Sequence, residues 1–405
     1  MKQLRVLNHL CLLVFFCSSV IMTSCNNQGG AHDGTAGDAL LKKAASLGLE
    51  GKALELFPKA EAGDVQAQID LADCYFNAIG CKSDTLEAFN WAKKAADQGN
   101  CYALTMVGVF YSNGFGTVKN DSLAKESYQK AFDIAKSLAE KEDAQGVGTL
   151  GTLCLHGVDG VVAQDVERGI SLLKKAAQLG DIRAMNSLIN KYNELQDYDM
   201  MVKYTKDAAA KGGVLGIYRL GVFYREGTGL PMDTTMAVEF FKKAAQQGLA
   251  MAKHSLAVCY EDGAGGLPQD YGKAVRLYQE AVKQGCNEAK NNLGLCYLNG
   301  KGVPQDYEKA VQLFQEVANK NPEAKCNLGI CYKDGKGVPQ DYEKAVQLFQ
   351  ESASQGCVNA IYGLAICYES GRGVPLDLIT AAKLYQLAAS YGHEGAREAL
   401  KDYGL

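Results

Sequence analysis

Residues 302–316 read GVPQDYEKAVQLFQE, and the same fifteen residues recur without a change at 337–351, 35 positions further along the chain. A fixed period of this length is typical of repeated helical hairpins, each of which is too small to bury its own apolar face. Such hairpins must stack on one another to form a core. We therefore predict an all-α solenoid whose function lies on a surface shared by several repeats, rather than in one enzymatic pocket.

Composition narrows the class of protein further. The chain has 405 residues, a length that would suggest two or three ordinary domains, but a solenoid grows by stacking and needs no such division. Nearly half of the residues (47%) are hydrophobic, so the chain can build a core. The net charge of −4 is too small to indicate a nucleic-acid partner, and the sequence has no basic patch with interleaved aromatic residues.

The first residues have the three-part form of a secretory signal. Lys2 and Arg5 supply the positive start, and residues 10–22 are apolar apart from Ser18 and Ser19. This apolar stretch is shorter than the ~20 residues that a membrane-spanning helix needs. We therefore interpret it as a targeting segment and not as part of the fold.

The segment ends in MTSC at residues 22–25, which resembles a bacterial lipobox, where small residues precede a cysteine that is lipidated and becomes the new N-terminus. We predict a signal peptide at 1–24, a lipid on Cys25 and a polar, Gly-rich tether at 25–37. More than one acyl chain on that cysteine anchors a protein stably. No acidic run follows Cys25, so we expect an outer membrane lipoprotein of a Gram-negative bacterium that faces the periplasm. A plain secretion signal is the alternative.

After the tether the chain repeats one pattern: a helix A, a Gly-rich loop, a helix B and a closing glycine. In the last complete unit we expect helix A at about 359–369 and the loop at 370–375. Asp377 is then the N-cap of helix B, because its carboxylate can accept a hydrogen bond from an otherwise unpaired amide. Helix B carries apolar residues at helical spacing and ends at Gly392.

The same pattern divides the chain into nine helix pairs with a leading partial unit. We place the solenoid at 38–392 and a C-terminal cap at 393–405. Two units are irregular: the second has a long helix B at about 122–141, and the fourth turns at 194–197 without a Gly-rich loop.

Two further residue types recur at fixed places in the repeats. The candidate N-caps of the other B helices are Asp84, Asp121, Asp165, Asp233, Asp270, Asp306 and Asp341. A small residue also recurs inside helix A, where glycine costs roughly 1 kcal/mol relative to alanine, so we expect helix B to approach closely there. These small residues are Ala72, Gly108, Gly151, Gly221, Ala257, Gly294, Gly329 and Ala365.

The loop Gly-x-Gly-Val-Pro-x-Asp, with Leu-Gly-x-x-Tyr before it and Lys-Ala-x-x-Leu-Phe after it, resembles the Sel1-like repeat, a relative of the tetratricopeptide repeat. The clearest copies run from 293 to 314 and from 328 to 349. The resemblance implies an α/α superhelix with the A helices on its concave side. It also implies a scaffold for protein–protein contacts, without naming the partner. Some secreted cysteine-rich bacterial members have been linked to β-lactam binding.

The sequence motifs that could indicate phosphate binding or catalysis are incomplete. The Gly-Lys-Gly loops at 300–302 and 335–337 lack the preceding strand and the Gly-Lys-Ser/Thr ending of a phosphate-binding loop, so we interpret them as structural turns. Ser-x-x-Lys occurs at 122–125 and 171–174, the spacing that places a lysine beside a nucleophilic serine in penicillin-recognising enzymes. Neither Ser-Asp-Asn nor Lys-Thr-Gly accompanies it. We therefore predict no catalysis and no cofactor.

Histidines and cysteines give no metal site either. The mature chain has only four histidines, and no two of them have metal-ligand spacing: His32, His156, His254 and His393. Fourteen cysteines would suit a disulfide scaffold, but two belong to the signal and Cys25 is predicted to carry lipid. Several of the remaining eleven precede a tyrosine in helix A, where other repeats have phenylalanine. We predict buried thiols, with Cys74–Cys81 as the one pair that the loop could bring together.

The family resemblance also indicates a binding groove. By analogy with tetratricopeptide units, the residues two before and two after the repeat leucine face the concave side, and an asparagine just before that leucine can hold a peptide backbone. The predicted ligand-binding residues are Asn190, Tyr218, Val222, His254, Asn291, Asn292, Asn327 and Tyr362. An aliphatic stripe runs beside them: Val258, Leu295, Ile330 and Ile366. This composition suits an extended peptide. The alternative is that the stripe only packs between neighbouring helices.

We therefore predict a lipid-anchored, non-catalytic scaffold of the bacterial cell envelope that binds a protein or peptide along this groove. Its partners would be that protein and the membrane, with no nucleic acid and no metal. Two alternatives remain open at this point. One is a weak β-lactam or peptidoglycan hydrolase that uses Ser122 or Ser171. The other is a purely structural spacer.

Overall fold

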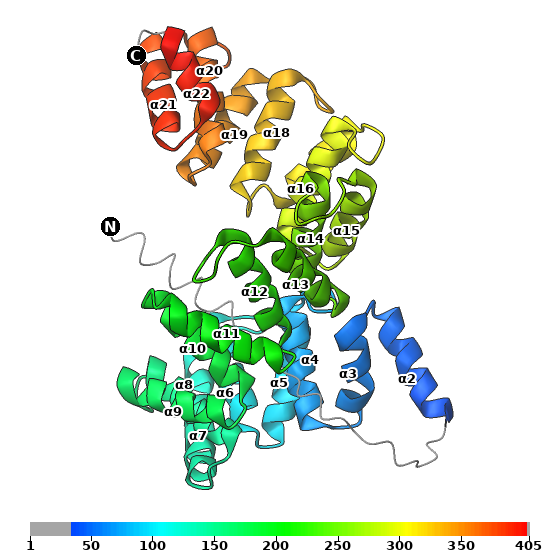
Figure 1. Ribbon diagram of the computed structural model, residues 1–405, viewed down its shortest axis with the longest axis vertical. Helices are drawn as coiled ribbons and strands as arrows, with labels where there is room; N and C mark the ends of the chain where they lie inside the picture. The colour runs from blue at the N-terminus through cyan, green and yellow to red at the C-terminus, as the bar shows by residue number, and fades with distance from the viewer. Residues whose placement is uncertain (1–33, 403–405) are drawn as a thin grey trace. The chain divides into compact units, whose positions relative to one another are not determined.

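A computed structural model describes residues 34–402 (Figure 1), and in that range the chain is helical throughout, with two isolated β-bridges and no longer strand. The predicted all-α repeat fold is confirmed. The helices of the leading partial unit and the first four pairs are α2 (Gly34–Ser46), α3 (Gly51–Glu61), α4 (Val65–Asn77), α5 (Thr85–Asp97), α6 (Cys101–Asn113), α7 (Asp121–Glu140), α8 (Ala144–His156), α9 (Val166–Gln178), α10 (Ile182–Glu194) and α11 (Tyr198–Ala210). The later helices are α12 (Val214–Glu226), α13 (Thr234–Gln246), α14 (Ala250–Asp262), α15 (Tyr271–Lys283), α16 (Asn287–Asn299), α17 (Tyr307–Val317), α18 (Pro322–Asp334), α19 (Tyr342–Ser354), α20 (Val358–Ser370), α21 (Leu378–Ser390) and α22 (Glu394–Asp402).

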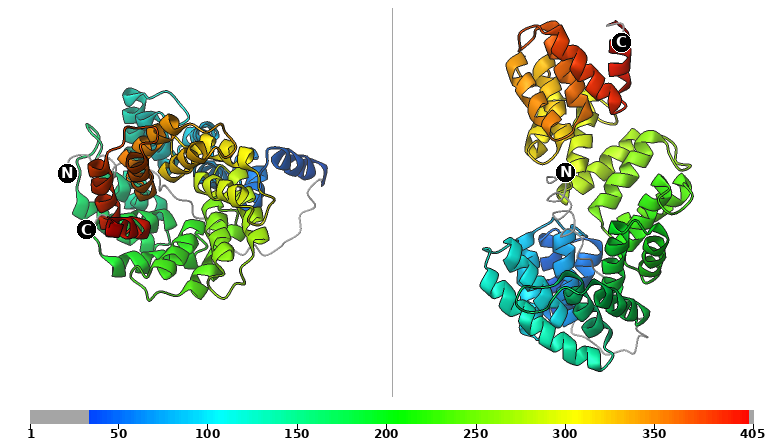
Figure 2. Two further views of the ribbon diagram at one scale, coloured as in Figure 1. Left: turned by 90° about the horizontal axis from the view of Figure 1, so that it is seen from above. Right: turned by 90° about the vertical axis from the view of Figure 1, so that its left-hand side faces the viewer.

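The hairpins group into two compact units. Unit 1 extends to Cys259 and includes residues 264–267, whereas unit 2 consists of Tyr260–Gly263 and everything from Pro268 onward. The boundary falls within α14 and the loop after it. Within each unit the hairpins follow one another in chain order, as the colour gradient shows (Figure 2).

Each hairpin begins with a local signal that the sequence carries. Asp377 accepts hydrogen bonds from the amides of Ile379 and Thr380 at 3.0 Å, which satisfies donors that the first turn of α21 would leave unpaired. The predicted caps Asp84, Asp165, Asp233, Asp270, Asp306 and Asp341 act in the same way. The prediction for Asp121 is wrong. Asn120 caps α7 by accepting from the amide of Leu123, and Asp121 is the first helical residue.

The small residue in helix A has the packing reason that its recurrence predicts. A Cβ added at Gly294 would lie 2.6 Å from the ring of Phe314, and one at Gly329 would lie 2.8 Å from Phe349. Both rings come from helix B of the same hairpin and are fully buried. Glycine is therefore retained despite its cost inside a helix, because it lets an aromatic ring reach the axis of helix A.

The glycines of the loop have a second role, which is to let repeats stack. The φ angle of Gly337 is 72°, a conformation that residues with a side chain rarely adopt. A Cβ on Gly337 would also collide with the backbone carbonyl of Tyr307, at the start of the preceding helix B. The Gly-Lys-Gly loops are thus turns that fit closely against the neighbouring repeat.

Unit 1 is wound so tightly that segments far apart in sequence touch. The amide of Gly80 donates to the carbonyl of Gly248 at 3.0 Å, and Ile79 pairs with Leu249 in an antiparallel bridge. One apolar cluster contains residues of α4 together with residues of α12 and α14. The first hairpin of the solenoid is therefore packed against the loop between α13 and α14.

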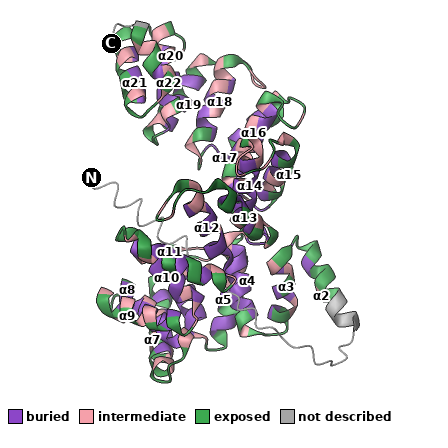
Figure 3. Ribbon diagram, in the orientation of Figure 1, coloured by how far each residue is buried: buried purple, intermediate pink, exposed green. Residues whose placement is uncertain are grey.

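Unit 2 contains more uniform hairpins. Its core is divided between clusters that each join neighbouring hairpins, one around Phe349 and one around Tyr385. Burial follows the helix faces that meet, while the loops and outer faces of the B helices are exposed (Figure 3). The terminal α22 packs on α21 as the predicted capping helix.

The predicted N-terminal features fall mostly outside the structure. The signal peptide, Cys25, His32 and most of the tether lie outside the described residues. Helix α2 begins at Gly34, four residues before the predicted start of the solenoid at residue 38. Among the described helices, none combines the length and the apolar character that spanning a membrane would require.

Candidate functional site

Several A helices contact one another directly. These contacts join α6 with α8 and α8 with α10 in unit 1, and α18 with α20 in unit 2, whereas the B helices contact chiefly A helices. The A helices therefore lie on the inner side of the curve. We call the inner surface of α16, α18 and α20 in unit 2 the A-helix face.

The A-helix face of unit 2 carries the predicted aliphatic stripe in a partly accessible state. Leu295, Ile330 and Ile366 are half-buried, although the repeat leucines beside them, such as Leu328, are buried. Each stripe residue is contributed by a different A helix, α16, α18 and α20 in turn. Apolar side chains that remain partly exposed along three stacked helices offer contact area to an added chain.

The predicted asparagines lie beside this stripe and are joined in a network. The Asn327 amide donates to the Asn291 side-chain oxygen at 2.9 Å, which links α18 to α16. Asn292 donates to the hydroxyl of Tyr278 at 3.3 Å, and that hydroxyl donates to Glu261 at 2.9 Å. The network therefore orients these side chains, and Asn327 is only half-buried, so its amide can be reached by a ligand backbone.

Tyr362 closes the C-terminal end of the same face. Its ring stacks on His393 with centroids 4.2 Å apart and packs at 5.7 Å from the ring of Tyr385. His393 also caps α22, because its Nδ1 accepts from the amide of Ala396 at 3.1 Å. Tyr362 is thus held firmly in place while it stays only half-buried.

The other four predicted residues belong to unit 1 and are considered separately. Asn190 accepts a hydrogen bond from Arg219 at 2.9 Å. Tyr218 lies 3.4 Å from the hydroxyl of Ser255 and packs on Phe241. Val222 and His254 are half-buried on the same side. Asn190 and Tyr218 therefore contact other side chains of unit 1.

A buried ionic cluster, which no sequence motif indicated, lies on the inner side of unit 1. Arg183 of α10 pairs with Asp70 of α4 at 2.9 Å, with side chains 10% and 2% exposed. The guanidinium also lies 4.5 Å from the ring centroid of Tyr102. Arg183 and Asp70 are 113 residues apart in the sequence, so the ion pair joins two hairpins that are distant along the chain.

Asp73 lies in the same cluster, one turn further along α4. It is fully buried, and its carboxylate oxygens have no hydrogen-bond partner among the described residues. Burial raises the pKa of Asp73 to about 8, while the positive charge of Arg183 acts against that rise. One signal could have revealed it: Asp73 stands two residues after the repeat leucine, where the next two repeats have Val109 and Thr152.

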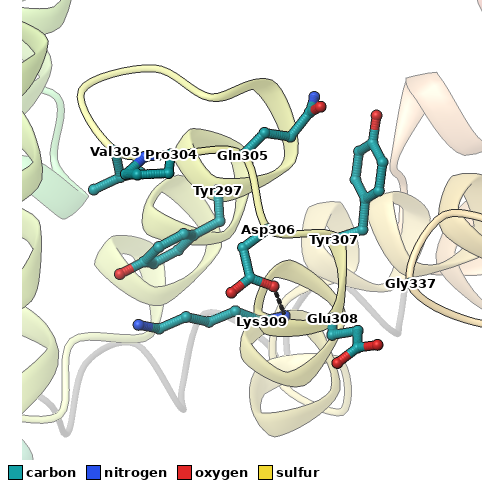
Figure 4. A pocket seen from close by; sticks show the side chains of 9 residues that line it. All are labelled: Tyr297, Val303, Pro304, Gln305, Asp306, Tyr307, Glu308, Lys309 and Gly337. Atoms are coloured by element: carbon teal, nitrogen blue, oxygen red, sulfur yellow. Dashed lines mark hydrogen bonds between the residues drawn. The ribbon is translucent and has the colours of Figure 1, made fainter.

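Two shallow hollows lie on the loop edge of unit 2, where the identical segments stack. One of about 640 Å³ is lined by Tyr297, Pro304, Tyr307 and Lys309 and closed by Gly337 of the next loop (Figure 4). The second, of about 550 Å³, repeats it one hairpin later and includes Tyr342. The duplicated segment, interpreted from its sequence as a structural turn, thus also forms two similar surfaces.

Candidates for catalysis are not assembled into a site. Ser122 and Ser171 are exposed on the B helices α7 and α9. A hydrogen bond to Tyr192 raises the pKa of Lys174, which makes this lysine a poorer base for Ser171. Within residues 34–402, no three His, Cys, Asp or Glu side chains come together as metal ligands would.

The cysteines behave as predicted in the part of the chain that is described. All eleven are buried, and Cys74 and Cys81 are free thiols that form no disulfide with each other. Each therefore occupies a core position as a small apolar side chain.

Stacked two-helix hairpins with an inner A-helix face define a helical-repeat protein of the tetratricopeptide-like class. The Sel1 repeat model matches residues 65–100, 101–133, 150–181, 214–249, 250–286, 287–321, 322–357 and 358–393. These matches cover well over half of the chain, so the protein belongs to the Sel1 repeat family. The hairpin α10/α11, predicted from its different turn to be irregular, lies outside all of them.

Similar proteins have varied roles. The chain is 27% identical over 213 residues to the chitin synthase regulator SKT5 of Saccharomyces cerevisiae, covering 51% of this chain and 31% of that one. It is 26% identical over 186 residues to the Sel1-repeat-containing protein YjcO of Escherichia coli K12, covering 46% of this chain and 63% of YjcO. The match thus spans less than two thirds of either relative.

A solved structure with the same fold covers more of the chain. It is c5321, described as a protective antigen of uropathogenic Escherichia coli strains with an SLR fold. The two chains superpose with a TM-score of 0.51 and 25% identity, over 87% of this chain and 83% of that one.

Proposed function

We propose that this protein is a non-catalytic interaction scaffold of the bacterial cell envelope, which binds an extended segment of another protein along the A-helix face of unit 2. Membership of the Sel1 repeat family supports the scaffold role. We choose this surface because it carries the half-buried stripe of Leu295, Ile330 and Ile366, with the asparagine network beside it. The stripe supplies apolar contact, and the amides supply hydrogen bonds to a peptide backbone.

The corresponding side of unit 1 suits a ligand less well. Its inner side is occupied by the Arg183–Asp70 pair, both of whose side chains are buried. A ligand that entered there would have to separate two desolvated charges, which costs several kcal/mol. The predicted residues Asn190, Tyr218, Val222 and His254 therefore contribute less to the proposed site than Asn291, Asn292, Asn327 and Tyr362.

Site-specific photo-crosslinking in the native cell tests this surface. A photoreactive phenylalanine at position 330 is expected to capture a defined protein that mass spectrometry can identify. The matched control is the same residue at position 347, where Gln347 is exposed on the B helix of the same hairpin. Equal capture of the same proteins from both positions would remove the A-helix face as the binding surface.

Mutation of the asparagine network provides the second arm. Asn327→Leu removes the donor to Asn291 and the amide offered to a ligand backbone, and it should weaken binding of the captured partner by about 10-fold, the usual worth of one or two hydrogen bonds. If the protein is only a spacer, changing Asn291, Asn327 and Tyr362 together, with Tyr218 and His254, will not alter any pull-down partner.

We also propose that Cys25 carries a lipid that anchors the protein in the outer membrane, facing the periplasm. The lipobox-like MTSC segment supports this assignment. Mass spectrometry of the mature N-terminus should find an acylated Cys25, and a Cys25→Ala chain should leave the membrane fraction. An unmodified N-terminus, or a variant that still sediments with membranes, would contradict the anchor.

The hydrolase alternative has its own test. Labelled penicillin should form no covalent adduct with the purified protein if the scaffold proposal is correct. An adduct that disappears on Ser171→Ala or Ser122→Ala would establish an acylated serine instead.

A further inference from the structure

We propose that Cys326 and Cys357 are a redox-active pair that forms a disulfide between two consecutive repeats of unit 2. Cys326 lies in α18, two residues before the repeat leucine Leu328. Cys357 is the N-cap residue of α20, the next A helix. Both belong to one buried apolar cluster, and both are unpaired thiols in the structure.

The repeat geometry places these two positions side by side. Elsewhere, the residue two before the repeat leucine packs on the N-cap of the following A helix. Tyr362 stacks on His393 in this way, with ring centroids 4.2 Å apart. In unit 1, a Cβ on Gly148 would collide with the carboxylate of Asp181, the N-cap of α10. Cys326 and Cys357 occupy the same two positions, and they are the pair at which both residues are cysteines.

The surroundings of the two thiols favour ionisation of Cys357 and protonation of Cys326. Cys357 is the N-cap residue of α20, and its side chain makes no capping hydrogen bond to that helix. A hydrogen bond with Cys326 lowers the pKa of Cys357 to about 6, although burial acts in the opposite direction. The same hydrogen bond, together with burial, raises the pKa of Cys326. The position of Cys357 at the N-terminus of α20 also favours a thiolate there, so we assign Cys357 as the attacking thiol and Cys326 as its protonated partner.

The chemistry requires an oxidant of the disulfide class. The Cys357 thiolate attacks one sulfur of the oxidant, the oxidant's S–S bond breaks, and one thiolate leaves and takes up a proton. Cys326 then loses its proton and attacks the Cys357 sulfur, releasing the second thiol. Two electrons pass to the oxidant, and two thiols are released for one disulfide formed. The product links α18 to α20 beneath the A-helix face, so oxidation fixes the spacing of Ile330 and Ile366.

The proposed pair differs from the other buried cysteines because its two members occupy positions that pack on each other in other pairs of consecutive repeats. Cys331 and Cys367 are also buried, but each lies in the C-terminal half of its own A helix, away from the N-cap of the next one. Trypsin releases Cys326 with Cys331, and Cys357 with Cys367, because no lysine or arginine separates the members of each couple. The double variant Cys331→Ser/Cys367→Ser therefore leaves one thiol in each peptide and serves as the reference chain.

The test is oxidation of the full chain with oxidised glutathione near pH 7.5, followed by alkylation of free thiols and peptide mapping without reductant. We expect one linked pair, residues 326–333 with 345–372, in the wild type and in the reference chain. The linkage should disappear on reduction with dithiothreitol, and it should raise the midpoint of thermal unfolding of the oxidised chain. Full alkylation of both peptides after oxidation, or a linkage between other cysteines, would overturn the proposal.

Single variants test the order of attack. In the reference chain with Cys326→Ser, Cys357 should accumulate as a mixed disulfide with glutathione. With Cys357→Ser, Cys326 should remain largely unmodified under the same conditions. Equal modification of the two would refute the assignment of Cys357 as the attacking thiol. The wild-type peptide map needs no substitution, so the pairing itself is tested even if a variant folds poorly.

Discussion

Units 1 and 2 are built from the same type of hairpin, yet different kinds of residues line their inner sides. In unit 1 the chain returns upon itself, and a buried charged pair joins α4 to α10 across the turn. In unit 2 the corresponding side is lined by aliphatic residues and amides that remain partly accessible. One repeat sequence therefore supports two outcomes, a closed structural turn and an open binding face. A few inward-facing residues decide between them.

The largest expected effect comes from removing the buried ion pair of unit 1. Arg183→Ala leaves Asp70 buried without its partner, so unit 1 should lose about 3–5 kcal/mol of unfolding free energy. The chain's only tryptophan, Trp91, is buried in α5 of unit 1 and reports this loss through fluorescence in urea titrations. Lys290→Ala in unit 2 is the control, because its partner Glu316 is 44% exposed and such pairs contribute about 1 kcal/mol or less. Similar losses for both variants would contradict the contrast drawn between the units.

The second prediction concerns pH. The native state holds a proton on Asp73 that the unfolded chain releases above pH 4, because the pKa rises from 3.8 to about 8. The stability of unit 1 should therefore fall as pH increases from about 4 to about 8. Asp73→Asn removes the contribution of this carboxyl and should stabilise unit 1 by about 4 kcal/mol near pH 7.

Urea titrations at several pH values, again followed by Trp91, measure the Asp73 effect. An unchanged slope of stability against pH in the Asn variant would mean that the carboxyl is ionised in the native protein.

A third change tests the packing inside unit 2. Gly329→Ala gains about 1 kcal/mol of helix propensity, but its Cβ would lie 2.8 Å from Phe349, and overpacking costs about 1–3 kcal/mol. We expect a net loss of about 1 kcal/mol, measured by urea unfolding followed by circular dichroism.

The last hairpin of unit 2 shows how alanine is accommodated. Ala365 stands at the equivalent position, opposite Tyr385, whose hydroxyl donates to Glu369 at 2.8 Å. Transferring that set as Gly329→Ala/Lys333→Glu/Phe349→Tyr should restore the lost stability. If the triple variant is less stable than Gly329→Ala alone, the aromatic partner does not explain the choice of small residue.

The smallest expected effect tests whether identical segments behave identically. Asp306 accepts from the amide of Lys309 at 2.9 Å, and Asp341 accepts from that of Lys344 at 2.8 Å. Replacing either by alanine should cost about 1 kcal/mol or less, with both losses equal within error in chemical denaturation. Unequal losses would show that the neighbouring repeats, rather than the local sequence, set the strength of these caps.

The sequence predicted features that depend on neighbours within one hairpin. Asp377 as a cap, Gly329 beneath an aromatic ring and the irregular turn at 194–197 are all decided by residues close together in the chain. The cap at Asp121 was misplaced by one position because two adjacent residues, Asn120 and Asp121, can both cap a helix.

Contacts between distant hairpins could not be predicted in this way. The Arg183–Asp70 pair depends on the rotation accumulated over three hairpins, so small deviations at each step decide whether the two side chains meet. The edge hollows were missed for another reason, since they form between two loops and belong to neither one alone. The Cys326–Cys357 pair likewise becomes visible only when the stacking of α18 on α20 is known.

Because the fifteen-residue segment is repeated without a change, unit 2 has two similar hollows on its loop edge. The first is lined by residues from Tyr297 to Lys309 and by Gly337, and the second lies one hairpin further along the chain. If a ligand carries two tandem copies of a short motif, binding of the first copy in one hollow holds the second copy at a high local concentration near the other hollow. Such a ligand would be retained far more strongly than a single copy, by a factor of 10²–10⁴ when the linker matches the spacing, without any new contact.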